Sequence, residues 1–251
     1  MEKTIRDQKF LYNKAGRGNV IILLHGWGSS SQSWFPVYKI LKKSYTVYAL
    51  DLPGFGNSPL PILPWDITDY ANYLNEFIMK SSLQNVCLIG HSFGGHIALK
   101  IASENPTYLR KLVLIDSAGI RNPDGLRNLG LLLAAKVGGA AFSLPMLRNY
   151  RDSMRTKFYE GTGINDFNRA SILQEIFTKV VADDVRAYLH SINIPTLIIW
   201  GNKDRTTPLA HGKIMRKLIH NASLSVLQGC SHFAYLEKPD VLSQMIRTFF
   251  S

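Results

Sequence analysis

The chain has 251 residues, 46% of them hydrophobic and 19% charged, with 29 Lys and Arg against 18 Asp and Glu. This length suits one large domain or one domain that carries an insertion. The net charge of +11 would suit an anionic partner. The basic residues are scattered and form no nucleic-acid-binding motif, however, so we expect no nucleic acid as a partner.

Two further features narrow the class of protein. No apolar run approaches the length of about 18 residues that a membrane span needs, and the first residues lack the apolar segment of a signal peptide. The two cysteines, Cys87 and Cys230, give neither a disulfide framework nor the spacing of a metal site. We therefore expect a cytoplasmic protein with no metal and no membrane span.

Apolar runs typical of buried strands alternate with helical periodicity along most of the chain. Strands are predicted over 5–12, 20–24, 45–50, 86–90, 112–115, 195–200 and 224–227, and helices over 33–41, 67–78, 209–219 and 239–250. The alternation stops over 120–192, where the pattern favours helices. We predict a doubly wound, mostly parallel α/β sheet formed by 1–119 and 193–251, with 120–192 as a helical cap.

The strand predicted at 86–90 leads into the sequence Gly90-His91-Ser92-Phe93-Gly94, after which a helical pattern begins. So sharp a turn from strand to helix strains the backbone of Ser92, and only glycine leaves enough space on either side. The turn raises the Ser92 hydroxyl above the sheet at a helix N-terminus, where a developing negative charge is favoured. The sequence predicts a nucleophile elbow here.

An acid and a base follow two later strands. Asp204 comes after the strand 195–200, and His232 comes after 224–227. The order Ser, Asp, His is the order found with a nucleophile elbow. Asp116, which follows the strand 112–115, is an alternative acid. Cys230 lies two residues from His232, but we interpret it as a small buried residue rather than a nucleophile.

These segments together resemble the α/β-hydrolase superfamily over nearly the whole chain. The resemblance rests on His25-Gly26-Trp27-Gly28, on 51–58, on the elbow, on Trp200-Gly201-Asn202-Lys203-Asp204 and on Gly229-Cys230-Ser231-His232-Phe233. It implies an α/β-hydrolase fold with a helical cap inserted after the sixth strand.

The resemblance also implies roles for single residues. Ser92 is expected to be the nucleophile, His232 the general base, and Asp204 the group that fixes the tautomer of His232. Backbone N–H groups of Trp27 and Phe93 are expected to form the oxyanion hole. Further substrate contacts are expected from His25, Gly26, His91 and Phe233. This chemistry needs neither metal nor organic cofactor.

Three functions are compatible with this site. The first is cleavage of a carboxylic ester or thioester of a small acyl substrate. The second is carbon–carbon bond hydrolysis, because Asp204-Arg205 resembles a segment of the meta-cleavage product hydrolases. The third is a slow-turnover ligand receptor, similar to the plant butenolide receptors.

The predicted cap suggests a partner. Its apolar residues fit an acyl or aromatic pocket, although most of them must pack the cap onto the core. Arg148, Arg151 and Arg155 share one face if 145–158 is helical. This face is either solvated or a docking patch for an acidic acyl carrier protein. The second interpretation follows a resemblance to the pimeloyl-carrier methyl ester esterases. The elbow of those enzymes contains a tryptophan at the position where this chain has His91.

Overall fold

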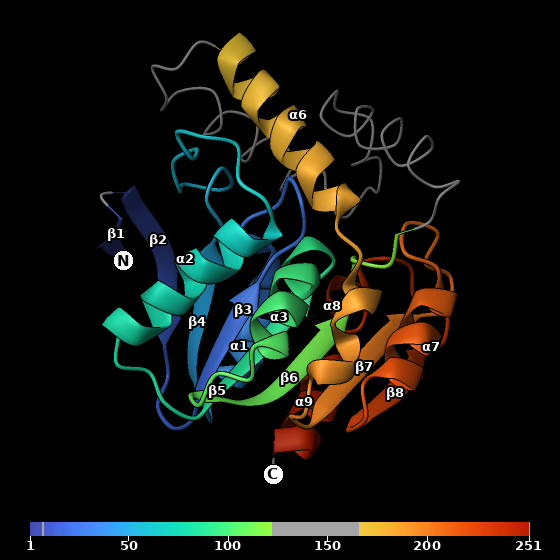
Figure 1. Ribbon diagram of the computed structural model, residues 1–251. Coiled ribbons are helices and arrows are strands. Elements are labelled where there is room, and N and C mark those ends of the chain that lie inside the picture. The colour runs from blue at the N-terminus through green and yellow to red at the C-terminus, as the bar shows by residue number, and fades with distance from the viewer. Residues whose placement is uncertain (7, 122–165, 251) are drawn as a thin grey trace.

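The computed structural model describes residues 1–6, 8–121 and 166–250. An eight-stranded sheet with the order β1-β2-β4-β3-β5-β6-β7-β8 runs through these ranges (Figure 1). The first two pairs, β1 with β2 and β2 with β4, are antiparallel, and the other neighbours are parallel. The strands are β1 (Glu2–Ile5), β2 (Gln8–Ala15), β3 (Val20–Leu24), β4 (Thr46–Asp51), β5 (Val86–His91), β6 (Leu109–Ile115), β7 (Thr196–Gly201) and β8 (Ala222–Leu227).

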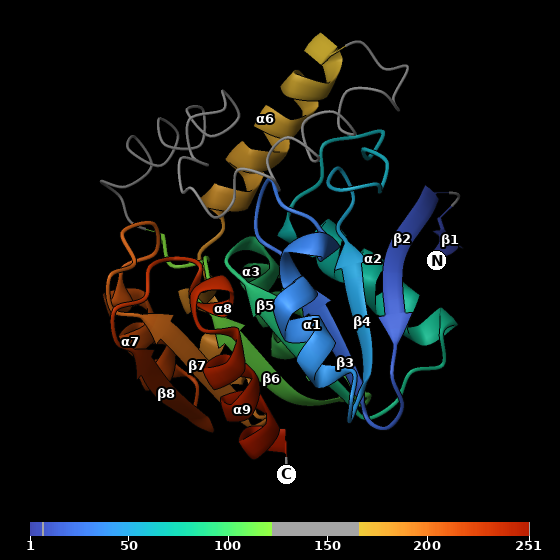
Figure 2. The same cartoon turned by 180° about the vertical axis from the view of Figure 1, so that it is seen from behind.

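Helices cover both faces of the sheet. The α-helices are α1 (Phe35–Leu41), α2 (Ile67–Lys80), α3 (Phe93–Ser103), α6 (Asp166–Ala182), α7 (Leu209–Leu218), α8 (Ala234–Glu237) and α9 (Pro239–Phe250). The short 3-10 helices within the described ranges are η1 (Ser31–Trp34), η3 (Val185–Ala187) and η4 (Leu189–Ser191). Helices α2 and α3 lie on one face (Figure 1), and α1 and α9 lie on the other (Figure 2).

The two faces follow from the alternation of side chains along each strand. In β3, Ile22 and Leu24 are buried against the layer of α2 and α3, whereas Ile21 and Leu23 are buried against the layer of α1 and α9. A strand covered on both faces must be apolar throughout, and this is the pattern that its sequence shows. The predicted doubly wound, mostly parallel sheet is confirmed.

The N-terminal strand was predicted as one element over 5–12, and this prediction is wrong. The chain forms a hairpin there, with Ile5 paired to Gln8 in an antiparallel register. Arg6 has a φ of +48°, a turn conformation that a continuous strand does not contain. The turn contains neither glycine nor proline, the residues that usually mark a turn, so the sequence pattern contains little sign of it. Of the other predicted elements, 20–24 agrees with β3 and 239–250 agrees with α9, and the rest differ by a few residues at their ends.

After β6 the chain leaves the sheet, and it returns at β7. Of the predicted cap, 122–165 lies outside the described residues, and the division into core and cap stays a prediction. Helix α6 crosses the carboxyl ends of the parallel strands (Figures 1 and 2). Arg169 Nη2 donates to the Gly54 carbonyl at 3.0 Å, and Lys179 Nζ donates to the Pro64 carbonyl at 2.9 Å. These bonds fix α6 against the segment between β4 and α2.

The segment after α6 is tied to α3. Asp183 Oδ2 accepts hydrogen bonds from His96 Nε2 at 2.7 Å and from the Tyr188 hydroxyl at 2.6 Å. Because α3 begins directly after Ser92, these bonds place α6 over the elbow. No helix in the described ranges is both long and apolar enough to cross a membrane.

Candidate active site

Ser92 lies in the turn between β5 and α3, with φ +50° and ψ −114°. A Cβ atom on Gly90 would lie 2.4 Å from the Gly94 carbonyl oxygen, and one on Gly94 would lie 2.4 Å from the Leu24 carbonyl oxygen. Both distances are far below van der Waals contact, so glycine is required at both positions. The local structure is therefore the sharp, strained turn that the sequence predicts.

The two predicted oxyanion residues lie beside Ser92. Trp27 and Phe93 line the same cavity as Ser92, and their rings contact each other with centroids 5.3 Å apart. Phe93 is the first residue of α3, and N–H groups in the first turn of a helix have no partner within the helix. The arrangement suits stabilisation of an oxyanion, and this role stays a prediction.

Asp204 is held in the loop that follows β7. Its Oδ1 accepts hydrogen bonds from the backbone N–H groups of Thr206 at 2.7 Å and Thr207 at 3.0 Å. Its Oδ2 accepts a hydrogen bond from His232 Nδ1 at 2.8 Å. Burial alone would raise the pKa of Asp204, but the hydrogen bonds from His232 and Thr207 outweigh burial, and this pKa is lowered. Asp204 is thus held as a carboxylate.

The loops that carry Asp204 and His232 approach each other closely. A Cβ atom on Gly201 would lie 2.3 Å from the Ser231 carbonyl oxygen, and the Lys203 N–H donates to the Cys230 carbonyl at 2.9 Å. The Trp200 indole N–H donates to the Thr207 carbonyl at 2.8 Å and fixes the other side of the Asp204 loop. Glycine at position 201 is therefore required for the two side chains to meet.

Asp116, the alternative acid, has a different environment. The carboxyl group has no exposed surface, and its Oδ1 accepts a hydrogen bond from the Gly201 N–H at 2.7 Å. Burial raises the pKa of Asp116 to about 8, against the lowering effect of the Gly201 N–H. The structure thus places Asp204 against His232 and places Asp116 under the loop of Gly201.

His91 and His25 are both buried, but their rings form hydrogen bonds with different loops. His91 Nε2 donates to the His232 carbonyl at 2.7 Å, and the two imidazole rings lie 4.8 Å apart. His91 therefore supports the loop of His232 as well as lining the cavity.

His25 does not line the cavity. Its Nε2 accepts a hydrogen bond from the Leu52 N–H at 3.1 Å, so Nδ1 carries the proton and donates to the Gly26 carbonyl at 2.8 Å. Burial lowers the pKa of His25 and keeps it neutral. Both ring nitrogens are occupied by contacts within the protein, so His25 joins two loops. Its predicted contact with substrate stays a prediction.

The predicted nucleophile and base line one cavity of about 90 Å³ beneath α6. Gly26 and Phe233, both predicted to contact substrate, lie in its wall. Helix α6 adds an apolar side formed by Phe177, Val180 and Val181. The cavity thus combines polar groups at one end with apolar walls, which is the usual composition of a small-molecule site.

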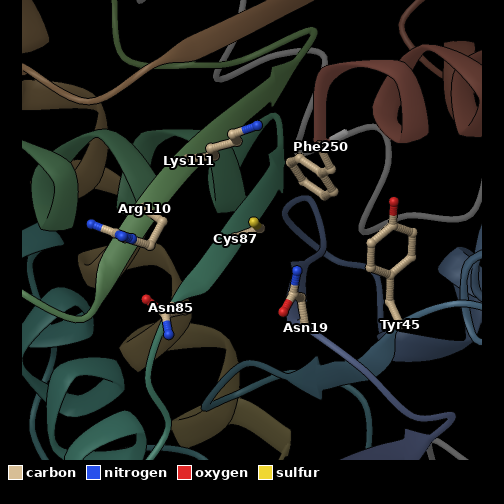
Figure 3. Close-up of a pocket in the computed structure, with 7 residues that line it drawn as sticks. All are labelled: Asn19, Tyr45, Asn85, Cys87, Arg110, Lys111 and Phe250. Atoms are coloured by element: carbon tan, nitrogen blue, oxygen red, sulfur yellow. The ribbon is translucent and has the colours of Figure 1, made fainter.

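A larger hollow of about 290 Å³ lies elsewhere, where the parallel strands begin (Figure 3). It is lined by Asn19, Tyr45, Asn85, Cys87, Arg110, Lys111 and Phe250, none of which is a predicted site residue. Burial raises the pKa of Cys87 to about 11, which makes this thiol a poor nucleophile. Chemistry is therefore expected at the smaller cavity.

Two further predictions concern Cys230 and the three arginines of the predicted carrier-docking patch. Cys230 is buried in the layer of α1 and α9, as expected of a small core residue, and its pKa is raised by burial. Arg148, Arg151 and Arg155, the predicted carrier-docking patch, lie outside the described residues.

Two residues near Asp204 were not identified from the sequence as part of the site. Thr207 lies between Asp204 and His232, and Gly201 allows their loops to meet. The three-residue spacing from Asp204 to Thr207 could have drawn attention to the threonine, because a side chain at this distance in a turn can reach back to the carboxylate.

The geometry defines a class: a strained serine elbow, with a histidine–aspartate pair in the later loops, on a doubly wound sheet. The model of the Alpha/beta hydrolase family matches residues 21–245. The chain therefore belongs to the Alpha/beta hydrolase family. This membership supports hydrolase activity.

Among the relatives is 2-hydroxy-6-oxo-6-phenylhexa-2,4-dienoate hydrolase of Comamonas testosteroni. It is 26% identical over 280 residues, which cover 99% of this chain and 93% of the relative. Monoacylglycerol lipase ABHD6 of Mus musculus is 25% identical over 267 residues, which cover 97% of this chain and 80% of the relative. The crystal structure of the enol-lactonase from Burkholderia xenovorans LB400 has a TM-score of 0.83 at 20% identity, covering 100% of this chain and 99% of that one.

Proposed function

We propose that this chain is a serine hydrolase that cleaves a carboxylic ester or thioester of a small acyl compound through an acyl-enzyme. The observation that carries the proposal is the 2.8 Å hydrogen bond between His232 Nδ1 and Asp204 Oδ2. His232, the donor of this bond, lines the same cavity as Ser92. A neutral histidine that donates through Nδ1 leaves Nε2 as the acceptor, and this nitrogen can take a proton from a serine hydroxyl.

In the first half of the reaction His232 Nε2 takes the proton from Ser92 Oγ as Oγ attacks the acyl carbon. The negative charge on the former carbonyl oxygen is stabilised by the N–H groups of Trp27 and Phe93. His232 then donates its proton to the leaving oxygen or sulfur, and the acyl-enzyme remains.

In the second half water takes the place of the leaving group. His232 removes a proton from this water as it attacks the acyl carbon, and then returns the proton to Ser92 Oγ as the acid is released. Asp204 stays ionised throughout, which is consistent with its lowered pKa, and it stabilises the imidazolium form of His232.

The walls of the cavity support an apolar acyl group. Phe177, Val180 and Val181 from α6 face the polar end that carries Ser92. Burying apolar surface against these side chains would bind the acyl chain without fixing its identity. The monoacylglycerol lipase relative supports an ester as substrate.

The test uses short p-nitrophenyl esters with the wild type, with Ser92→Ala and with a series of acyl chain lengths. Ester turnover in the wild type and its loss in Ser92→Ala are expected. Full activity of Ser92→Ala would overturn the nucleophile assignment. Rapid steady-state turnover would also exclude the slow-turnover receptor, because such a receptor hydrolyses its ligand only slowly.

Carbon–carbon bond hydrolysis is a second candidate because one relative, 26% identical over 99% of this chain, carries the name of a dienoate hydrolase. A ring-cleavage dienoate offered beside the esters distinguishes the two. Rapid cleavage of the dienoate with slow ester turnover would favour this candidate.

A further inference from the structure

Thr207 lies at the centre of the acid and base pair. Its side chain is largely buried, with 7% of the residue exposed. The Thr207 hydroxyl oxygen lies 2.7 Å from Asp204 Oδ2, 3.2 Å from His232 Nδ1 and 3.0 Å from the Asp116 carbonyl oxygen. One hydroxyl group therefore contacts three separate parts of the site.

The hydroxyl has a single proton and two acceptors within reach. The carboxylate of Asp204 is both nearer and charged, and hydrogen bonds to a charged acceptor are the stronger ones. Thr207 therefore donates to Asp204 Oδ2, the oxygen that also accepts from His232 Nδ1.

The two oxygens of Asp204 are held by different groups. Oδ1 accepts hydrogen bonds from two backbone N–H groups, which a side-chain substitution does not remove. Oδ2 is held by His232 and by Thr207. Loss of the hydroxyl would leave His232, the group to be oriented, as the partner of Oδ2 among these contacts.

We propose that Thr207 is a positioning residue, which fixes Asp204 Oδ2 toward His232 and so maintains the reactive tautomer and orientation of His232. This inference rests on the proposed function of the Ser92, His232 and Asp204 site. Thr207 acts through Asp204 and takes no proton from the substrate.

The test compares Thr207→Val, which keeps the shape and removes the hydroxyl, with Thr207→Ser, which keeps the hydroxyl. A hydrogen bond to a charged group typically contributes enough for a 10- to 100-fold effect. Thr207→Val is expected to lower kcat for a p-nitrophenyl ester by about that factor, with KM nearly unchanged. Thr207→Ser is expected to remain within a few-fold of the wild type.

A matched control is Thr196→Val. Thr196 is a buried threonine at the start of β7, and its hydroxyl donates to a backbone carbonyl, that of Ile194, at 3.1 Å. This control is expected to keep kcat while showing the stability change that loss of a buried threonine hydroxyl causes. An equal fall of kcat in Thr196→Val and Thr207→Val would overturn the proposal.

A spectroscopic readout separates positioning from a structural role. The proton that His232 Nδ1 shares with Asp204 should give a far-downfield proton resonance, which Asp204→Asn removes. In Thr207→Val this resonance is expected to shift or broaden while the melting curve stays cooperative. If Thr207→Val does not fold, Thr207→Ala is measured in its place with the same expectations.

The outcomes keep the two proposals distinct. Wild-type kcat and an unchanged resonance in Thr207→Val, with Ser92→Ala inactive, would overturn the role of Thr207 and leave the proposed function intact. Activity that survives in Ser92→Ala would overturn the proposed function itself.

Discussion

Replacing Asp116 with asparagine removes a buried ionisable group and keeps its shape. The Gly201 N–H, which donates to Asp116 Oδ1 at 2.7 Å, keeps an oxygen acceptor in the variant. The same substitution at Asp204 removes the carboxylate that accepts from His232 at 2.8 Å. The two variants are chemically matched, but we expect Asp116→Asn to keep its activity and to gain stability at higher pH, whereas Asp204→Asn should lose its activity.

The effect of Asp116→Asn on stability follows from its pKa, which burial raises from 3.8 to about 8. Between these pH values the unfolded chain releases the proton and the native chain retains it. The free energy of unfolding of the wild type therefore falls as pH rises through this window, by about 1.4 kcal/mol per pH unit. From pH 6 to pH 8 the free energy of unfolding of the wild type falls by about 2–3 kcal/mol from this group. Asp116→Asn does not show this fall, because asparagine does not titrate.

Urea unfolding of the wild type and Asp116→Asn at pH 6 and pH 8 measures this difference. Asp116→Asn should gain about 2–3 kcal/mol relative to the wild type over this interval and keep its kcat within a few-fold. Asp204→Asn should lose about 10³- to 10⁴-fold in kcat, because His232 loses the acceptor that fixes its tautomer. Equal pH dependence of the two unfolding curves would refute the reasoning about Asp116, and a large loss of kcat in Asp116→Asn would make it the acid.

Three further predictions concern the elbow, the loop junction and the substrate cavity. Gly90→Ala places a Cβ atom 2.4 Å from the Gly94 carbonyl oxygen, so it should destabilise the fold by about 1–3 kcal/mol or more, seen as a lower Tm in circular dichroism; an unchanged Tm would contradict the packing described. His25→Ala leaves the buried Leu52 N–H without its acceptor and should cost about 1–3 kcal/mol in urea unfolding; an effect on KM alone would instead support His25 as a substrate contact. Val181→Trp fills part of the cavity that Val181 lines, so kcat/KM should fall more for long acyl esters than for acetyl esters; a uniform fall would exclude Val181 from the acyl wall.

Much of the fold could be predicted because strands covered on both faces leave a strong apolar signal. The runs at β5 and β7 are buried throughout, and β3 is buried from Ile21 onward; their sequences are correspondingly apolar. The hairpin of β1 and β2 was missed because its turn at Arg6 involves no glycine or proline, the residues that usually mark a turn.

The candidate site could be predicted in part for a similar reason. Serine, aspartate and histidine at the ends of parallel strands must lie along one edge of the sheet, so their meeting follows from topology. The places of His25 and Thr207 could not be predicted, because they depend on the partners of each polar atom. His25 carries the same motif whether it faces a substrate or the Leu52 N–H, and only the folded loops decide between the two.

Labelling with a fluorophosphonate, followed by mass spectrometry of the peptides, tests the role of Ser92 most directly. The reagent forms a covalent bond with an activated serine and mimics the tetrahedral intermediate of acyl transfer. One adduct is expected, on Ser92, with complete loss of ester turnover and with no labelling in Ser92→Ala. An unlabelled Ser92 in a protein that still turns over esters, or labelling that persists in Ser92→Ala, would contradict the account.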